Sequence, residues 1–133
     1  MGTAGAEQRQ YEFAIGLLSN PPLSALRGWL RGLLADEPDE VLIDVELVAT
    51  ELVTNAYEHT GQLLAVRVTR PVDRPVLRVE VDDDAPDRPP RPGASTRGGF
   101  RGRGLQMVDG ISAQWGFELG DDRKTVWVEV PLR

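Results

Sequence analysis

The apolar and polar positions in the first half of the chain follow the pattern of one strand and then two helices. Apolar side chains recur at every second position over residues 11–17, which predicts a strand with one buried face. Leucines recur at helical spacing over residues 23–34, and a longer apolar stripe of the same period covers residues 39–59. The polar start, residues 1–10, is predicted to be a loose arm.

The second half of the chain returns to strand-like alternation. Residues 64–68 and 77–81 alternate on either side of a Pro-Val-Asp-Arg-Pro turn, which predicts an antiparallel hairpin. A short helix is expected at 105–111, followed by strands at 115–119 and 124–130. Helices separated from hairpin-connected strands favour an α/β (α+β) fold. We expect a two-layer sandwich in which helices cover one face of a mixed, largely antiparallel sheet.

This regular pattern stops over residues 85–103. The segment is rich in proline and glycine and almost free of apolar side chains, as expected for a functional or disordered loop. Five arginines and no acids lie between Arg88 and Arg103, against an otherwise acidic background. We therefore predict one domain, residues 11–133, with a long loop that could hold an anion.

Composition narrows the classes of function. A chain of 133 residues has room for one compact domain, and its 15 basic and 21 acidic residues give a formal charge of -6, which disfavours binding to duplex DNA. No cysteine and a single histidine exclude disulfides and the common zinc sites. We find no apolar run of the roughly 20 residues that cross a bilayer, and no signal peptide, so we expect a cytoplasmic protein away from the membrane.

The first candidate site is the pair Glu51 and Asn55 on the longer predicted helix. Residues four apart lie one turn above each other, and this pair borders the apolar stripe of Val48 and Leu52. Oxygen ligands of this kind suit a hard divalent cation, and a carboxylate near it could orient or deprotonate a hydroxyl group. The alternative is that Glu51 is a solvated helix residue and Asn55 a helix-end group.

The second candidate is Asp83. Strand parity predicts that it shares the apolar face of the strand, whereas Asp82 and Asp84 lie on the opposite face. A carboxylate at the end of an apolar face needs donors, and an exocyclic amine is one that would suit it. The alternative is that the strand ends before Asp83 and all three acids are solvated.

The third candidate is Gly102-Arg103-Gly104, which opens the short helix that begins at Leu105. Glycines before a helix allow backbone N–H groups to surround an anion at the positive helix end, which suits a phosphate chain. A solvated loop, or one that holds nucleic acid, is the alternative.

Taken in order, these pieces resemble the nucleotide site of the histidine kinase-like ATPase (GHKL, Bergerat fold) superfamily. ELVTNAYEHT at 51–60 resembles its N-box, VEVDDDAP at 79–86 its first glycine box, and GRGLQMVDGISAQWG at 102–116 its second. The small size and the ending KTVWVEVPL at 124–132 are most similar to the anti-sigma regulatory factors, serine/threonine-protein kinases, and to their actinobacterial ATP-binding relatives.

The resemblance implies ATP and Mg²⁺ as ligands and gives each site residue a role. Asn55 would hold the Mg²⁺ ion against the phosphates, and Glu51 would act as the base or orient the accepting hydroxyl group. Asp83 would take the adenine amino group, with Thr125 beside it through a water molecule. In phosphoryl transfer a protein mainly positions groups and neutralises charge, so this small set could suffice.

The resemblance also implies a lid and a set of partners. Residues 85–103 would be the ATP lid, and the cofactor would also be bound at its end by Gly102, Arg103, Gly104 and Leu105. The two glycines would form the lid hinge. The expected partners are a sigma factor and a serine of an anti-anti-sigma (STAS) protein, with a possible homodimer.

One departure from the family pattern leaves two functions open. The family's D-x-G-x-G is here Asp83-Asp84-Ala85-Pro86-Asp87, without either glycine. Alanine removes a position of close backbone approach, and proline stiffens the residues that follow. The chain is therefore predicted to be either a kinase or a nucleotide-binding or partner-binding module of the same fold without kinase activity.

Overall fold

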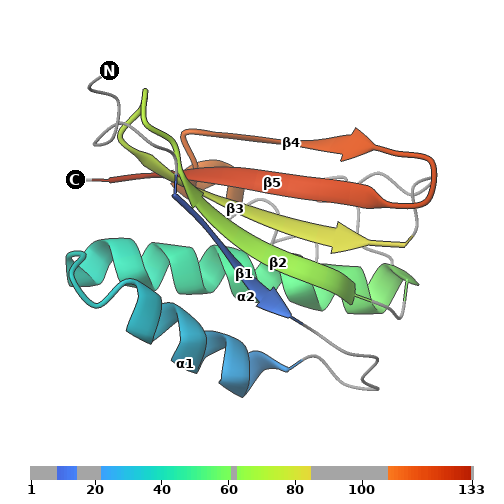
Figure 1. Cartoon of the computed structure of the whole chain (residues 1–133), viewed down its shortest axis with the longest axis horizontal. Coiled ribbons are helices and arrows are strands. Elements are labelled where there is room, and N and C mark those ends of the chain that lie inside the picture. The colour runs from blue at the N-terminus through green and yellow to red at the C-terminus, as the bar shows by residue number, and fades with distance from the viewer. Residues whose placement is uncertain (1–8, 15–21, 61–62, 85–107, 133) are drawn as a thin grey trace.

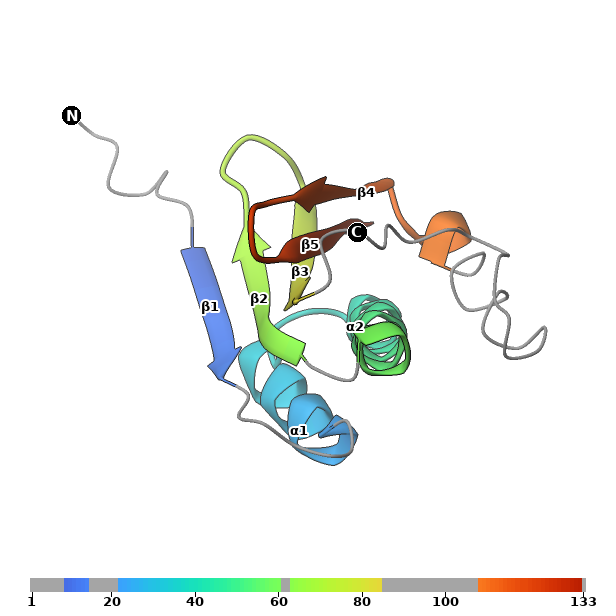
Figure 2. The same ribbon diagram turned by 90° about the vertical axis from the view of Figure 1, so that its right-hand side faces the viewer.

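The computed structural model describes residues 9–14, 22–60, 63–84 and 108–132, which form one sheet with helices on one face (Figures 1 and 2). The elements are β1 (Arg9–Ala14), α1 (Leu23–Leu33), α2 (Asp39–Thr60), β2 (Leu63–Arg70), β3 (Val76–Asp83), β4 (Gln114–Leu119) and β5 (Lys124–Pro131). Residues 108–111 add one helical turn before β4. The strands lie in the order β1-β2-β3-β5-β4, and each neighbouring pair is antiparallel.

The predicted fold class and element order are confirmed. The sheet is antiparallel throughout the described strands, rather than mixed. The largest difference concerns β1, which begins at Arg9 and ends at Ala14, so Arg9 and Gln10 belong to the sheet and not to the predicted arm. Three stretches of the predicted elements lie outside the described residues. They are residues 1–8 of the predicted arm, 15–17 of the predicted first strand and 105–107 of the predicted short helix.

The core lies between the sheet and its helix layer. In Figure 2, α1 lies beneath β1 and β2, and α2 lies beneath β3 and β5. Leu26 and Leu30 of α1 have no exposed surface, because their helical spacing places both against the sheet and α2. The other buried apolar residues include Val41, Val45, Val48, Leu52, Val66, Val68, Leu77, Val79, Val81, Val126, Val128 and Val130. Alternate strand positions therefore supply one continuous apolar face.

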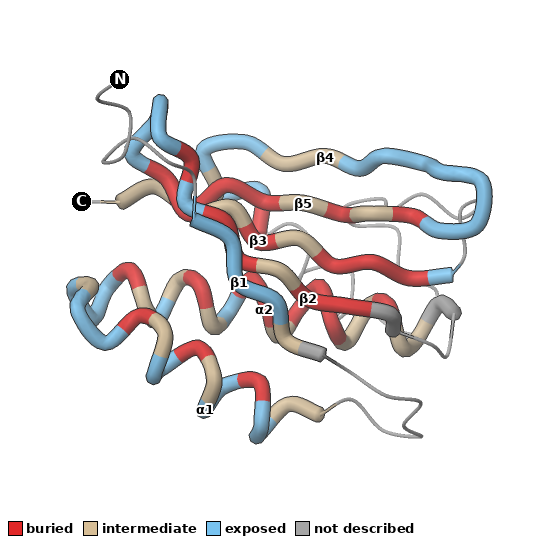
Figure 3. Tube along the Cα trace, in the orientation of Figure 1, coloured by how far each residue is buried: buried red, intermediate tan, exposed pale blue. Residues whose placement is uncertain are grey.

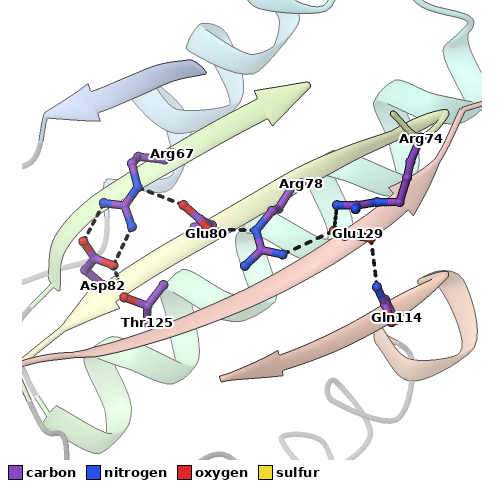
Figure 4. Close-up of polar contacts among 8 residues, drawn as sticks. All are labelled: Arg67, Arg74, Arg78, Glu80, Asp82, Gln114, Thr125 and Glu129. Atoms are coloured by element: carbon purple, nitrogen blue, oxygen red, sulfur yellow. Dashed lines mark hydrogen bonds and ion pairs between the residues drawn. The ribbon is translucent and has the colours of Figure 1, made fainter. Parts of the chain in front are cut away.

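The opposite face of the sheet is covered by none of the helices that the structure describes, and it carries a network of ion pairs (Figure 4). Arg67 on β2 pairs with Glu80 and Asp82 on β3, and Arg78 on β3 pairs with Glu80 and with Glu129 on β5. These contacts link the three central strands across their backbone hydrogen bonds. Opposite charges on neighbouring strands stabilise such pairings.

An aromatic ring also packs against this ion-paired face. The guanidinium of Arg78 lies 4.2 Å from the centre of the Trp127 ring. On the neighbouring strand, Gly116 is the register partner of Trp127, and a Cβ at that glycine would come within 2.9 Å of the ring. Glycine is therefore required there by close packing.

Burial falls from the centre of the sheet to its edges (Figure 3). β3 and β5 are mostly buried, whereas Phe117 and Leu119 on edge strand β4 expose 40% and 54% of their surface. None of the helices in the described part of the chain is long and apolar enough to cross a membrane.

Candidate functional site

Glu51 and Asn55 lie on the flank of α2 that faces away from α1. The opposite flank carries Glu46, which accepts a hydrogen bond of 2.9 Å from Arg31 of α1. A helix turns by about 100° per residue, so Glu51 and Asn55 project between the core stripe and the solvent side, on the flank remote from Glu46. Figure 2 shows α2 between α1 and the helical turn 108–111, and this flank is on the side of that turn.

Both groups are withdrawn from solvent. Glu51 is 8% exposed, so the alternative of an ordinary solvated helix residue is wrong. The Nδ2 atom of Asn55 is buried and has no hydrogen-bond partner among the residues that the structure describes. A buried amide of this kind is costly unless something bound to the protein pairs with it. A buried carboxylate beside a buried amide nitrogen, on a residue that is itself half-buried, is what the edge of a ligand site requires.

Asp83 ends β3 on the same side of the sheet as the helices. β3 keeps its pairing through this residue, with Leu63 on one neighbouring strand and Lys124 on the other, and β2 absorbs a register shift between Leu63 and Ala65. Asp83 is 2% exposed, and its Oδ2 atom lies 3.5 Å from the Nζ atom of Lys124. The predicted face is confirmed, and the alternative that all three acids are solvated is wrong. In Figure 1 this end of β3 lies above the C-terminal half of α2.

Asp82 has the opposite orientation and is held by the ion-paired face (Figure 4). Its carboxylate accepts hydrogen bonds of 2.6 and 2.8 Å from Arg67 and one of 2.7 Å from the Thr125 hydroxyl group. Burial alone would raise the pKa of Asp82. The hydrogen bonds from Arg67 and Thr125, with the charges of Arg67 and Arg123, outweigh burial and hold this pKa below its usual range.

Thr125 therefore lies elsewhere than expected. Its register partner is Asp82, and its hydroxyl group donates to that residue rather than standing beside Asp83. The two side chains project from opposite faces because Asp82 and Asp83 are consecutive in a strand. This corrects the expected neighbourhood, and a role of Thr125 toward a nucleotide stays a prediction.

The helical turn 108–111 is anchored to the sheet. Val108 is fully buried, and the Asp109 carboxylate accepts a hydrogen bond of 2.8 Å from the indole nitrogen of Trp115 on β4. The backbone N–H of Ala113 donates to the carbonyl oxygen of Glu129 at 2.8 Å. The predicted cofactor residues Gly102, Arg103, Gly104 and Leu105 precede this turn and lie outside the described residues, as does the predicted lid, 85–103.

Two features of the site were missed from the sequence. One is the network that fixes Asp82, although charges of both signs on the outward positions of adjacent strands were a usable signal. The other is Lys124, a buried lysine at the start of β5. Its signal was weaker, because the register that sets it opposite Asp83 depends on the length of the long loop and on the pairing of β3 with β5.

Comparison with known families decides the identity of this fold. The family model of the histidine kinase-like ATPase domain matches residues 21–130, which include both helices and the end of β3. The chain belongs to this family. The predicted resemblance to the superfamily is thereby confirmed, and the matched residues include Glu51, Asn55 and Asp83.

A solved structure of another protein has the same fold as this chain. It is described as the RsbU and RsbW domains of Rv1364c from Mycobacterium tuberculosis, and it is similar with a TM-score of 0.65 at 20% sequence identity. The similarity covers 93% of the present chain and 32% of that chain, so the present chain spans about a third of it. No curated protein matches by sequence.

Proposed function

We propose that the chain binds ATP with Mg²⁺ and acts as an anti-sigma factor and serine-protein kinase in a partner-switching system. The observation that carries this proposal is the burial of the Glu51 side chain and of the Asn55 Nδ2 atom, one turn apart on the same flank of α2, in a chain of this family. A buried amide beside a buried carboxylate fits a cation and its phosphates better than it fits open solvent.

The roles of the residues follow from their chemistry. Asn55 presents an amide whose oxygen is a hard ligand, and Glu51 presents a carboxylate that accepts a proton from a serine hydroxyl group or orients it. Asp83 presents acceptor oxygens to an amino group of the base. Bound Mg²⁺ would supply neutralisation of phosphate charge, and it commonly uses few protein ligands because it keeps waters and phosphate oxygens.

The partners follow from the sequence resemblance. We propose a sigma factor and a STAS-domain anti-anti-sigma protein, with the serine acceptor on the latter, in the cytoplasm and without direct DNA contact. The likeness to a chain that includes an RsbW domain supports the fold of such a module. A homodimer is compatible with this assignment.

Isothermal titration with ATP and Mg²⁺ tests the nucleotide site. We expect the wild type to bind and Asn55→Ala to bind at least about tenfold more weakly, which corresponds to about 1.4 kcal/mol. Thr50→Ala is the matched control, because Thr50 is half-buried like Asn55 but lies about 140° around the axis of the same helix. Equal binding by all three proteins, or by none of them, would overturn the proposal.

A second candidate is a binding module that has lost catalysis. Its support is the first glycine box, where Ala85 and Asp87 stand at the two glycine positions and Pro86 stiffens the segment between them; these residues lie outside the described part of the chain. Incubation with labelled ATP and a serine-containing STAS partner separates the two. The kinase transfers label, and Glu51→Gln keeps ATP binding but loses transfer. A stable complex without label on the partner identifies the binding module.

A further inference from the structure

Lys124 is a buried cation beside the carboxylate proposed to hold the nucleotide base. Its side chain is only 5% exposed and its Nζ atom lies 3.5 Å from the Oδ2 atom of Asp83. Lysine is almost never buried in proteins unless it is paired, because an ammonium group loses much hydration free energy on burial. The chain therefore retains this costly group at one specific place, the end of β3.

The spacing of this pair differs from that of the ion pairs on the other face of the sheet. Arg67 approaches Asp82 to 2.6 Å, and Arg78 approaches Glu80 to 2.8 Å, so those groups hydrogen bond directly. At 3.5 Å, the carboxylate of Asp83 and the ammonium of Lys124 form a longer ion pair, and since an ammonium has three N–H donors and a carboxylate about four acceptor sites, this contact does not exhaust either group. They present an acceptor next to a donor on the helix-facing side of the sheet.

An acceptor beside a donor matches one edge of a 6-aminopurine. That edge carries an exocyclic amino group, which donates, directly beside the ring nitrogen N1, which accepts. We propose that Lys124 is a specificity-determining residue that donates a hydrogen bond to N1, while Asp83 accepts from the amino group. This inference rests on the proposed function and extends it from one recognition group to a pair.

The same pair would reject a 6-oxopurine. There the 6-position accepts and N1–H donates, so the oxygen would meet the Asp83 carboxylate and the N–H would meet the Lys124 ammonium. Two acceptors, or two donors, that face each other form no hydrogen bond, so these buried polar groups would be left unpaired. Sites that hydrogen bond their substrate discriminate strongly against such analogues for this reason. The order of the two groups therefore selects adenine over hypoxanthine or guanine.

Binding of ATP and 1-deaza-ATP, in which a C–H group replaces N1, tests this pairing directly. We expect the wild type to bind ATP at least about tenfold more tightly than 1-deaza-ATP, because a charge-assisted hydrogen bond is lost. Lys124→Met keeps the length of the side chain without its charge, and it should bind the two nucleotides with similar affinity. The comparison is a double-mutant cycle between one side chain and one ring atom.

Two variants control for folding and for general charge. Lys124→Arg keeps a cation and donors, so its preference for ATP should persist. Arg123→Met removes the exposed neighbouring cation, and its preference should equal that of the wild type. If Lys124→Met weakens both nucleotides equally and keeps the preference, Lys124 only neutralises Asp83 and the inference is wrong.

The wild type alone supplies a test if Lys124→Met fails to fold. Equal affinity of the wild type for ATP and 1-deaza-ATP, or for ATP and inosine triphosphate, would overturn the inference while leaving the proposed function intact. Absence of binding by any of these nucleotides would instead overturn the proposed function itself. A preference for ATP over both analogues, lost only in Lys124→Met, supports the assignment.

Discussion

Asp82 and Asp83 are consecutive carboxylates, equally buried, yet they belong to different regions of the molecule. Asp82 faces the ion-paired surface, where Arg67 and Thr125 hold it with three hydrogen bonds of 2.6 to 2.8 Å. Asp83 faces the helix layer, with Lys124 at 3.5 Å. Burial of an acid therefore does not by itself indicate a ligand site. The face of the sheet on which each acid lies separates the structural acid from the candidate binding acid.

Removal of the charge of Arg67, on the ion-paired face, should give the largest loss of stability. Arg67→Met leaves Asp82 buried without its main partner, and breaking a buried pair from one side costs about 3 kcal/mol or more. We expect the free energy of unfolding, measured in urea, to fall by about that amount.

The matched control is Arg31→Met. Arg31 forms an exposed pair with Glu46, with 64% of the arginine side chain accessible, and surface pairs contribute at most about 1 kcal/mol. Equal losses from the two variants would mean that the ion-paired face behaves as an ordinary solvated surface, contrary to the comparison above.

The apolar face should be intolerant of a single hydroxyl group. Val79 has no exposed surface, and Val79→Thr keeps its shape while placing a polar group in the core. A buried hydroxyl group without a partner costs about 2 kcal/mol. Thermal or urea unfolding measures this loss, and an unchanged stability would show that the core side of β3 admits water or a new hydrogen bond.

The reverse exchange, of threonine for valine on the ion-paired face, should lower the stability by less. Thr125→Val removes the hydroxyl donor to Asp82, whereas Arg67 still pairs with that carboxylate, so we expect a loss of about 1 kcal/mol. ATP affinity, measured on the same variant, sharpens the comparison. An unchanged dissociation constant assigns Thr125 to the ion-paired face alone, and weaker binding restores its predicted contact with the nucleotide.

Hydrophobic periodicity explains why most of the fold could be predicted from the sequence. Each strand alternates with a period of two and each helix carries a stripe of period 3.6, so both the faces and the order of the elements were visible in the sequence. The start of β1 was not, because Arg9 and Gln10, which pair with Arg70 and Thr69 of β2, carry no apolar alternation. Periodicity reports a buried face, but it does not report where the partner strand ends.

The candidate site was only partly predictable, for a related reason. The positions of Glu51, Asn55 and Asp83 follow from local geometry, a helix turn and strand parity, and these were correct. The neighbours of Thr125 and Lys124 depend on the register between β3 and β5, which are separated by the long loop and β4. Register is set by tertiary pairing, and a shift of one residue exchanges the two faces.

The smallest expected effect is on the pH dependence of stability. The folded pKa of Asp82 lies below its value in the unfolded chain, about 3.9, so the unfolded state binds more protons as the pH falls toward that value. The stabilisation from Asp82 is therefore present above about pH 4 and is lost as the pH falls through the folded pKa. In Arg67→Met the same carboxylate lacks the cation that lowers its pKa, so the stability gap between this variant and the wild type should narrow on acidification. Urea unfolding of both proteins from pH 7 down to the lowest pH at which both remain folded measures the gap. A gap that stays constant or widens would mean that Arg67 stabilises the sheet through its packing and not through the charge of Asp82.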